Sequence, residues 1–241
     1  MGGNRSHTLY FAPLLFIFGV ILSNTELSHV IPIFTGFFSV YVFFLAIRNI
    51  KLRGIEAVAI APLISGAIMF LVNGWTSSLF GIGLFLSLMR IGMKKNLVLR
   101  SLFRGLGLGL GFSLGLSAGG GPLFLYIFGI QVMIIGTGLS MLNALVRSEI
   151  FEIKFLDRSV GELYIRIFIS ILLMFAVVFS PITGIFFSVK ESFLLLTLLG
   201  GSTLLYGAVR LVYMAVPARE ISKLILMGAA FYIFAHISIL T

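Results

Sequence analysis

Carboxylates crowd together at one place in this chain, and the chemistry open to them is metal binding. Four of the eight acidic residues fall within residues 149–162, as Glu149, Glu152, Asp157 and Glu162. Carboxylate oxygens are the ligands that a hard divalent cation such as Mg²⁺ prefers. This cluster could therefore hold a divalent cation such as Mg²⁺, which is the candidate cofactor.

The same stretch has a structural interpretation, which the sequence leaves open. The basic residues Lys154 and Arg158 are interleaved with the acids. In a solvated amphipathic loop these charges would pair with one another and hold no metal. Glu149 would then pair with Lys154, or Glu162 with Arg158.

The elements that must position these charges belong to a membrane protein. The 241 residues are 59% hydrophobic and 10% charged, with a mean hydropathy of +1.16. A soluble domain carries about 25% charged residues, so a soluble enzyme and a disordered tail are excluded. The chain has no cysteine, which excludes a disulfide scaffold and thiolate chemistry. We therefore expect a multi-pass protein of the cell membrane, with residues 1–241 forming a single transmembrane helical domain.

Apolar stretches between charged breaks predict nine membrane spans. A spanning helix needs roughly 20 mostly apolar residues, so nine spans leave room for little else. The predicted fold class is an all-α polytopic helix bundle. Its expected spans are residues 8–24, 29–47, 54–73, 75–92, 105–120, 122–145, 167–188, 192–212 and 221–240.

The positive charges orient these spans. With the N-terminus inside, 16 of the 17 Lys and Arg residues fall in cytoplasmic segments, and only Lys190 lies outside. Cytoplasmic loops are enriched in Lys and Arg, so the pattern predicts that the N-terminus is inside and the C-terminus outside. The net charge of +9 is then an orientation signal, and nucleic acid is a poor fit as a partner.

The fifth predicted span carries a glycine stripe, formed by Gly107, Gly111, Gly115 and Gly119 at intervals of four residues. Such a stripe lets two helix backbones approach closely in lipid. The functional alternative is a pore or substrate crevice lined by backbone. The run of glycines at 119–121 with Pro122 predicts a helix break before the sixth span.

This layout resembles the UbiA superfamily of intramembrane prenyltransferases. In that family two Asp-rich motifs follow spans two and six and bind a prenyl diphosphate through Mg²⁺. The charged segments 48–56 and 147–162 stand at those two places here. The second family motif is Asp-x-x-x-Asp-x-x-x-Gly. Asp157 and Gly161 match its second half, and Glu152 lies one residue from the position of the first Asp.

Two further stretches carry the resemblance. Residues 218–226 are similar to the family's closing helix, and His7 with Pro13 and Gly19 resembles the opening of the YwiC-like branch. The first family motif, Asn-Asp-x-x-Asp-x-x-x-Asp, is degenerate, because residues 49–56 retain one asparagine and one acid beside two basic residues. Arginine can grip a phosphate bidentately. The resemblance thus implies Glu149, Glu152 and Asp157 as the candidate metal ligands. It also implies a diphosphate-binding set of Arg48, Asn49, Lys51, Arg53 and Arg158.

The function expected from this resemblance is Mg²⁺-dependent, prenyltransferase-like action on a polyprenyl diphosphate or another isoprenoid lipid at the cytoplasmic face. The expected partner is therefore a membrane lipid or isoprenoid. Two alternatives remain open. One is a transporter or channel subunit that uses the glycine stripe and helix break as its pathway. The other is a non-catalytic scaffold among the subunits of a larger membrane complex.

Overall fold

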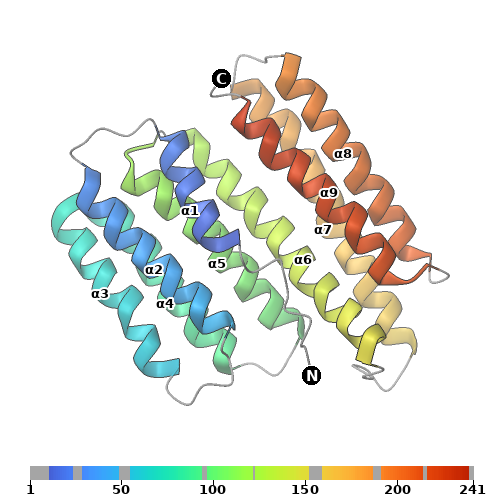
Figure 1. Cartoon of the computed structure of the whole chain (residues 1–241), viewed down its shortest axis with the longest axis horizontal. Coiled ribbons are helices and arrows are strands. Elements are labelled where there is room, and N and C mark those ends of the chain that lie inside the picture. The colour runs from blue at the N-terminus through green and yellow to red at the C-terminus, as the bar shows by residue number, and fades with distance from the viewer. Residues whose placement is uncertain are drawn as a thin grey trace. The chain divides into compact units, whose positions relative to one another are not determined.

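The computed structural model is all-helical wherever it describes the chain (Figure 1). The described residues are 11–23, 29–48, 55–93, 97–121, 123–151, 159–186, 191–213 and 216–238. Their helices are α1 (Phe11–Leu22), α2 (Val30–Arg48), α3 (Ile55–Asn73), α4 (Trp75–Met93), α5 (Leu97–Ala118), the short 3₁₀ helix η3 (Leu123–Leu125), α6 (Tyr126–Phe151), α7 (Ser159–Phe186), α8 (Glu191–Val212) and α9 (Ala218–Ile237).

Each of the nine predicted apolar segments corresponds to an α-helix among these described residues. Two helices begin about two turns earlier than predicted, α5 at Leu97 and α7 at Ser159. The added turns contain Arg100 and Arg104 in α5 and Glu162 in α7. A charged residue marks the end of the apolar part of a span, but long charged side chains are good helix formers and continue the helix beyond it.

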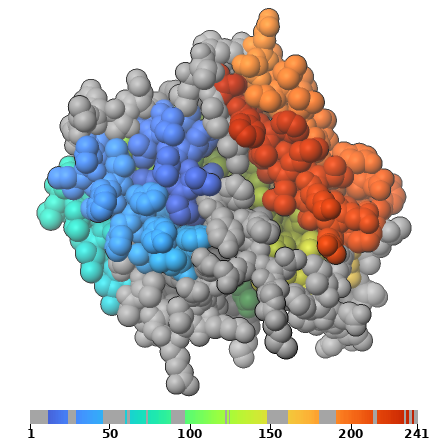
Figure 2. Space-filling model, viewed as in Figure 1, coloured from blue at the N-terminus to red at the C-terminus, as the bar shows by residue number. Residues whose placement is uncertain are grey.

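Composition and exposure together indicate a membrane protein. Among the described residues, four helical segments are long and apolar enough to cross a membrane: Leu97–Ala118, Tyr126–Arg147, Gly161–Phe179 and Glu191–Val212. Large apolar side chains are also turned outward, with Phe34 on α2 exposed to 73% and Leu71 on α3 to 82%. The side chains of α2 form much of the blue surface of the face shown in Figure 2. Apolar surface on this scale needs a lipid or protein partner.

The described residues divide into two compact units, residues 1–136 (unit 1) and residues 137–241 (unit 2). Helix α6 contributes its first part to unit 1 and its last part to unit 2. Within unit 1, α5 packs against α1, α2 and α4, and α3 packs against α2 and α4. The buried aromatic side chains of this core include Phe16, Phe43 and Phe112.

Neighbouring helices pack against the glycine stripe of α5. A methyl group at Gly107 would overlap the ring of Phe43 on α2, and one at Gly111 would lie 3.5 Å from the side chain of Val40. At Gly115 the overlap would be with the backbone carbonyl oxygen of Phe16 on α1. Gly107 and Gly115 therefore serve tight packing, and Gly111 lies at an ordinary contact distance from α2. This favours the packing interpretation over a backbone-lined pathway.

The crossing of α1 and α5 is reciprocal. A methyl group at Gly19 on α1 would overlap the carbonyl oxygen of Phe112 on α5, just as one at Gly115 would overlap the carbonyl oxygen of Phe16. Each glycine thus brings its backbone against a carbonyl of the other helix. This is the close approach that small residues permit between membrane helices, where weak Cα–H···O contacts add to dispersion.

Helix α5 ends as the glycine run predicts. Gly120 has a φ of +76°, the left-handed conformation that glycine adopts without strain. The amide of Gly121 donates to the carbonyl oxygen of Leu116 at 2.7 Å, and the amide of Gly120 donates to that of Ser117 at 3.2 Å. This pair of bonds is a Schellman motif, which satisfies the last carbonyls of the helix.

In unit 2, α8 packs against both α7 and α9. Glycines again allow close contact, because a methyl group at Gly200 would lie 3.1 Å from the carbonyl oxygen of Gly228, and one at Gly207 would lie 2.8 Å from the side chain of Ile225. Gly200 of α8 thus lies against Gly228 of α9, and Gly207 lies against the earlier residue Ile225. Residue numbers therefore rise along α8 where they fall along α9. The two helices form an antiparallel hairpin.

Candidate functional site

The sequence-predicted site lies outside the side chains that the structure describes. Arg48 is the last residue of α2 and Glu149 belongs to the last turns of α6, but their side chains are not among those described. The remaining predicted residues lie beyond the described residues altogether: Asn49, Lys51, Arg53, Glu152, Asp157 and Arg158.

Metal binding by the three predicted carboxylates therefore stays a prediction. Among the described side chains, no three His, Asp or Glu residues come together as a group that could hold a metal ion. The donor set of Glu149, Glu152 and Asp157 suits Mg²⁺ chemically, because all of its ligand atoms would be hard carboxylate oxygens.

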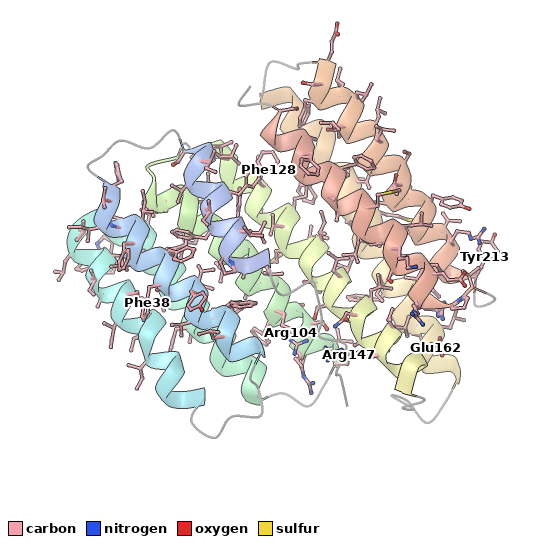
Figure 3. The ribbon with its side chains drawn as sticks, viewed as in Figure 1. Phe38, Arg104, Phe128, Arg147, Glu162 and Tyr213 are labelled. Carbon is pink, nitrogen blue, oxygen red and sulfur yellow. The ribbon has the colours of Figure 1, made fainter. Side chains whose placement is uncertain are left out.

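The described part of unit 2 contains a buried cation that the sequence did not single out. Only 3% of the Arg166 side chain is exposed. Its Nε and Nη2 atoms both lie 2.9 Å from Oε1 of Glu162, one helical turn earlier on α7 and labelled in Figure 3. Its Nη1 donates to the backbone carbonyl oxygens of Leu211 at 3.3 Å and Val216 at 3.1 Å.

This guanidinium joins the start of α7 to the end of α8 and the turn that follows it. The last carbonyls of a helix have no partner within the helix, and a cation placed there also complements the helix dipole. The Oγ of Ser170, one turn further along α7, donates a hydrogen bond to the carbonyl oxygen of Ala208 at 2.7 Å. Arg166 and Ser170 thus hold the seam between α7 and α8 together by polar contacts, and the role of Arg166 is structural.

Unit 1 holds a small cluster of hydroxyl groups near the end of α5. The Oγ atoms of Ser77 on α4 and Ser117 on α5 lie 2.8 Å apart, and Ser117 also donates to Oγ1 of Thr76 at 3.3 Å. The ring of Tyr126 at the start of α6 stacks on Phe80 of α4, with ring centroids 5.3 Å apart. The hydroxyl groups join α4 to α5, and the stacked rings join α4 to the start of α6.

Fold and chemistry together define a class: an all-helical membrane protein whose described polar groups mainly join helices. Comparison of the chain with protein families, curated proteins and solved structures finds no match.

A signal for Arg166 was present in the sequence. Glu162 and Arg166 stand four residues apart immediately before an apolar run, which is the spacing of an ion pair on one helix face. The charge pattern predicts a loop at residues 147–166, in which Glu162 pairs with Arg158. In the structure α7 begins at Ser159 and Glu162 pairs with Arg166, while Arg158 lies outside the described residues.

Proposed function

We propose that this chain is a multi-pass protein of the cell membrane with nine spans, its N-terminus inside and its C-terminus outside. The four long apolar helical segments support this arrangement. The basic residues support the orientation, since 16 of 17 fall on one side when nine spans are assigned.

The absence of cysteine gives a direct test of this topology, because each introduced cysteine is the only thiol. We expect Lys190→Cys to react with a membrane-impermeant maleimide in intact cells. We expect Arg53→Cys to react only after the membrane is permeabilised. Labelling of Arg53→Cys in intact cells, or protection of Lys190→Cys until permeabilisation, would contradict the proposed orientation.

For its activity, we propose that the chain binds an isoprenoid diphosphate at the cytoplasmic face, in the manner of the UbiA superfamily that its layout resembles. One observation carries this proposal: the two charged segments begin at the ends of the second and sixth α-helices of the described chain. Helix α2 ends at Arg48 and α6 ends at Phe151. Prenyl transfer would be the enzymatic extension of this binding.

The two segments would contribute different chemistry. Glu149, Glu152 and Asp157 would hold Mg²⁺, which when bound offsets the charge of a diphosphate. Lys51 and Arg53 stand where the family has acids, and would contact the diphosphate oxygens directly. Part of the binding is therefore expected to survive removal of Mg²⁺.

Binding of geranylgeranyl diphosphate to the purified chain, with Mg²⁺ and with EDTA, tests this proposal. We expect Asp157→Asn to weaken binding at least about tenfold with Mg²⁺, since loss of even outer-shell partners weakens metal sites by that factor. The same variant should bind like the parent chain in EDTA. Arg53→Gln should weaken binding under both conditions.

Matched controls come from charges at the opposite predicted side of the membrane. Glu191→Gln controls for Asp157→Asn, and Lys190→Gln controls for Arg53→Gln. Equal losses of affinity in the control variants would contradict the proposal. An affinity for geranylgeranyl diphosphate no higher than that for geranylgeraniol would also contradict it. The scaffold alternative would then be favoured.

A further inference from the structure

We propose that the corner of unit 2 between α8 and α9 binds the headgroup of an anionic phospholipid of the surrounding membrane. The basic side chains of this corner are Arg210, Arg219 and Lys223, and all three are exposed. We call them the basic corner. None of them belongs to the predicted diphosphate site, so the two proposals stand or fall separately.

The register of the hairpin brings these residues to one end. Gly207 on α8 faces Ile225 on α9, so the next turn of α8, with Arg210, lies level with the first turns of α9. Those turns carry Arg219 and Lys223. Arg166 donates to the carbonyl oxygens of Leu211 and Val216, and these hydrogen bonds hold the connecting turn at the same end.

Arg210 is held in a geometry suited to a phosphate. Its Nη1 donates to the hydroxyl of Tyr206 at 3.2 Å, and its guanidinium carbon lies 5.6 Å from the centre of the Tyr206 ring. Stacking on an aromatic face orders the planar guanidinium and leaves other N–H groups directed outward. Such a fork matches the oxygens of a phosphate.

Depth in the membrane favours a lipid as the source of that phosphate. The candidate span Glu191–Val212 ends two residues after Arg210, which puts the guanidinium at the level of the headgroups. Two exposed tyrosines, Tyr206 at 53% and Tyr213 at 64%, occupy the same end. Figure 3 labels Tyr213 there. Amphipathic aromatic side chains are typical of the membrane–water interface.

Among the described side chains, the charge balance at the basic corner is positive. The described acids of this end are Glu220, which is exposed, and Glu162, which is bonded to Arg166. Clusters of basic residues beside a membrane helix attract anionic lipids electrostatically. Basic residues at a cytoplasmic end are expected from the orientation of the chain in the membrane alone. That orientation does not require an arginine that stacks on an exposed tyrosine at the end of a span.

The test measures phosphatidylglycerol bound to the full chain in neutral detergent micelles, by native mass spectrometry and by lipid titration. We expect the triple variant Arg210→Gln, Arg219→Gln, Lys223→Gln to lose affinity about tenfold or more. The single variant Arg210→Lys keeps the positive charge but removes the planar guanidinium, and should lose less affinity for the lipid than the triple variant. Helical content and elution volume would confirm that each variant is folded.

A matched triple variant separates a built site from general surface charge. Lys94→Gln, Lys95→Gln, Arg100→Gln removes the same charge from the same predicted side of the membrane, and should retain affinity within about twofold. Equal loss in this control would overturn the proposal. So would equal binding of phosphatidylcholine, or displacement of the lipid by millimolar inorganic phosphate, which would indicate a site for the free anion.

Discussion

Replacing Gly115 with alanine is expected to lower the free energy of unfolding by about 2 kcal/mol, the usual scale for overpacking in a tight core. The added methyl group would overlap the carbonyl oxygen of Phe16 on α1. Because the obstacle is backbone, no side-chain rotation can relieve it and the two helices must move apart. Unfolding by sodium dodecyl sulfate in mixed micelles, followed by fluorescence of the single tryptophan, Trp75, measures the change.

Gly111 supplies the control on the same face of α5, one turn earlier. A methyl group there would meet the Val40 side chain at 3.5 Å, an ordinary contact distance. Gly111→Ala should therefore be neutral or stabilise by up to about 1 kcal/mol, the gain in helix propensity. If the two variants had equal stability, Gly115 would not be a point of close contact between α1 and α5.

Replacing Arg166 with leucine is expected to destabilise the chain by about 3 kcal/mol, the lower end of the cost of breaking a buried ion pair. The variant would leave the carbonyls of Leu211 and Val216 without this donor, and Glu162 without its partner. The lower end applies because 40% of the Glu162 side chain is exposed and water can partly replace the arginine. Circular dichroism during detergent unfolding reports the loss.

A double-mutant cycle distinguishes the ion pair from the contacts with the carbonyls. Glu162→Leu combined with Arg166→Leu should be more stable than Arg166→Leu alone by about 1 kcal/mol, because no unpaired carboxylate remains. It should not regain the parent stability, since the carbonyls are still without the guanidinium. A coupling energy near zero would show that Arg166 acts through α8 alone.

The positions of the helices could be predicted because the apolar segments and charged breaks of this chain alternate clearly. The break at Gly120 was also predictable, since a run of glycines ends a helix through its φ angle. The early starts of α5 and α7 were not predicted, because a charged residue marks the limit of the hydrocarbon and not of the helix. Arg100 and Glu162 show the difference between these two limits.

The partners of the glycines could not have been predicted from one sequence. A glycine stripe with four-residue spacing predicts that one face of α5 is lined by small residues. It does not predict that Gly19 of α1 packs against that face. That pairing depends on how helices distant in the chain assemble. The predicted diphosphate and metal residues also remain predictions, since the degenerate motif around Asp157 specifies residue types and not their arrangement in space.

The reciprocal glycine contact between α1 and α5 has a consequence for biosynthesis. Gly19 leaves the ribosome about a hundred residues before Gly115, which at roughly 5–20 residues per second is a delay of some 5–20 seconds. During that interval the face of α1 that will receive α5 has no permanent neighbour in unit 1. The packing of unit 1 around α1 can therefore be completed only after α5 has been synthesised.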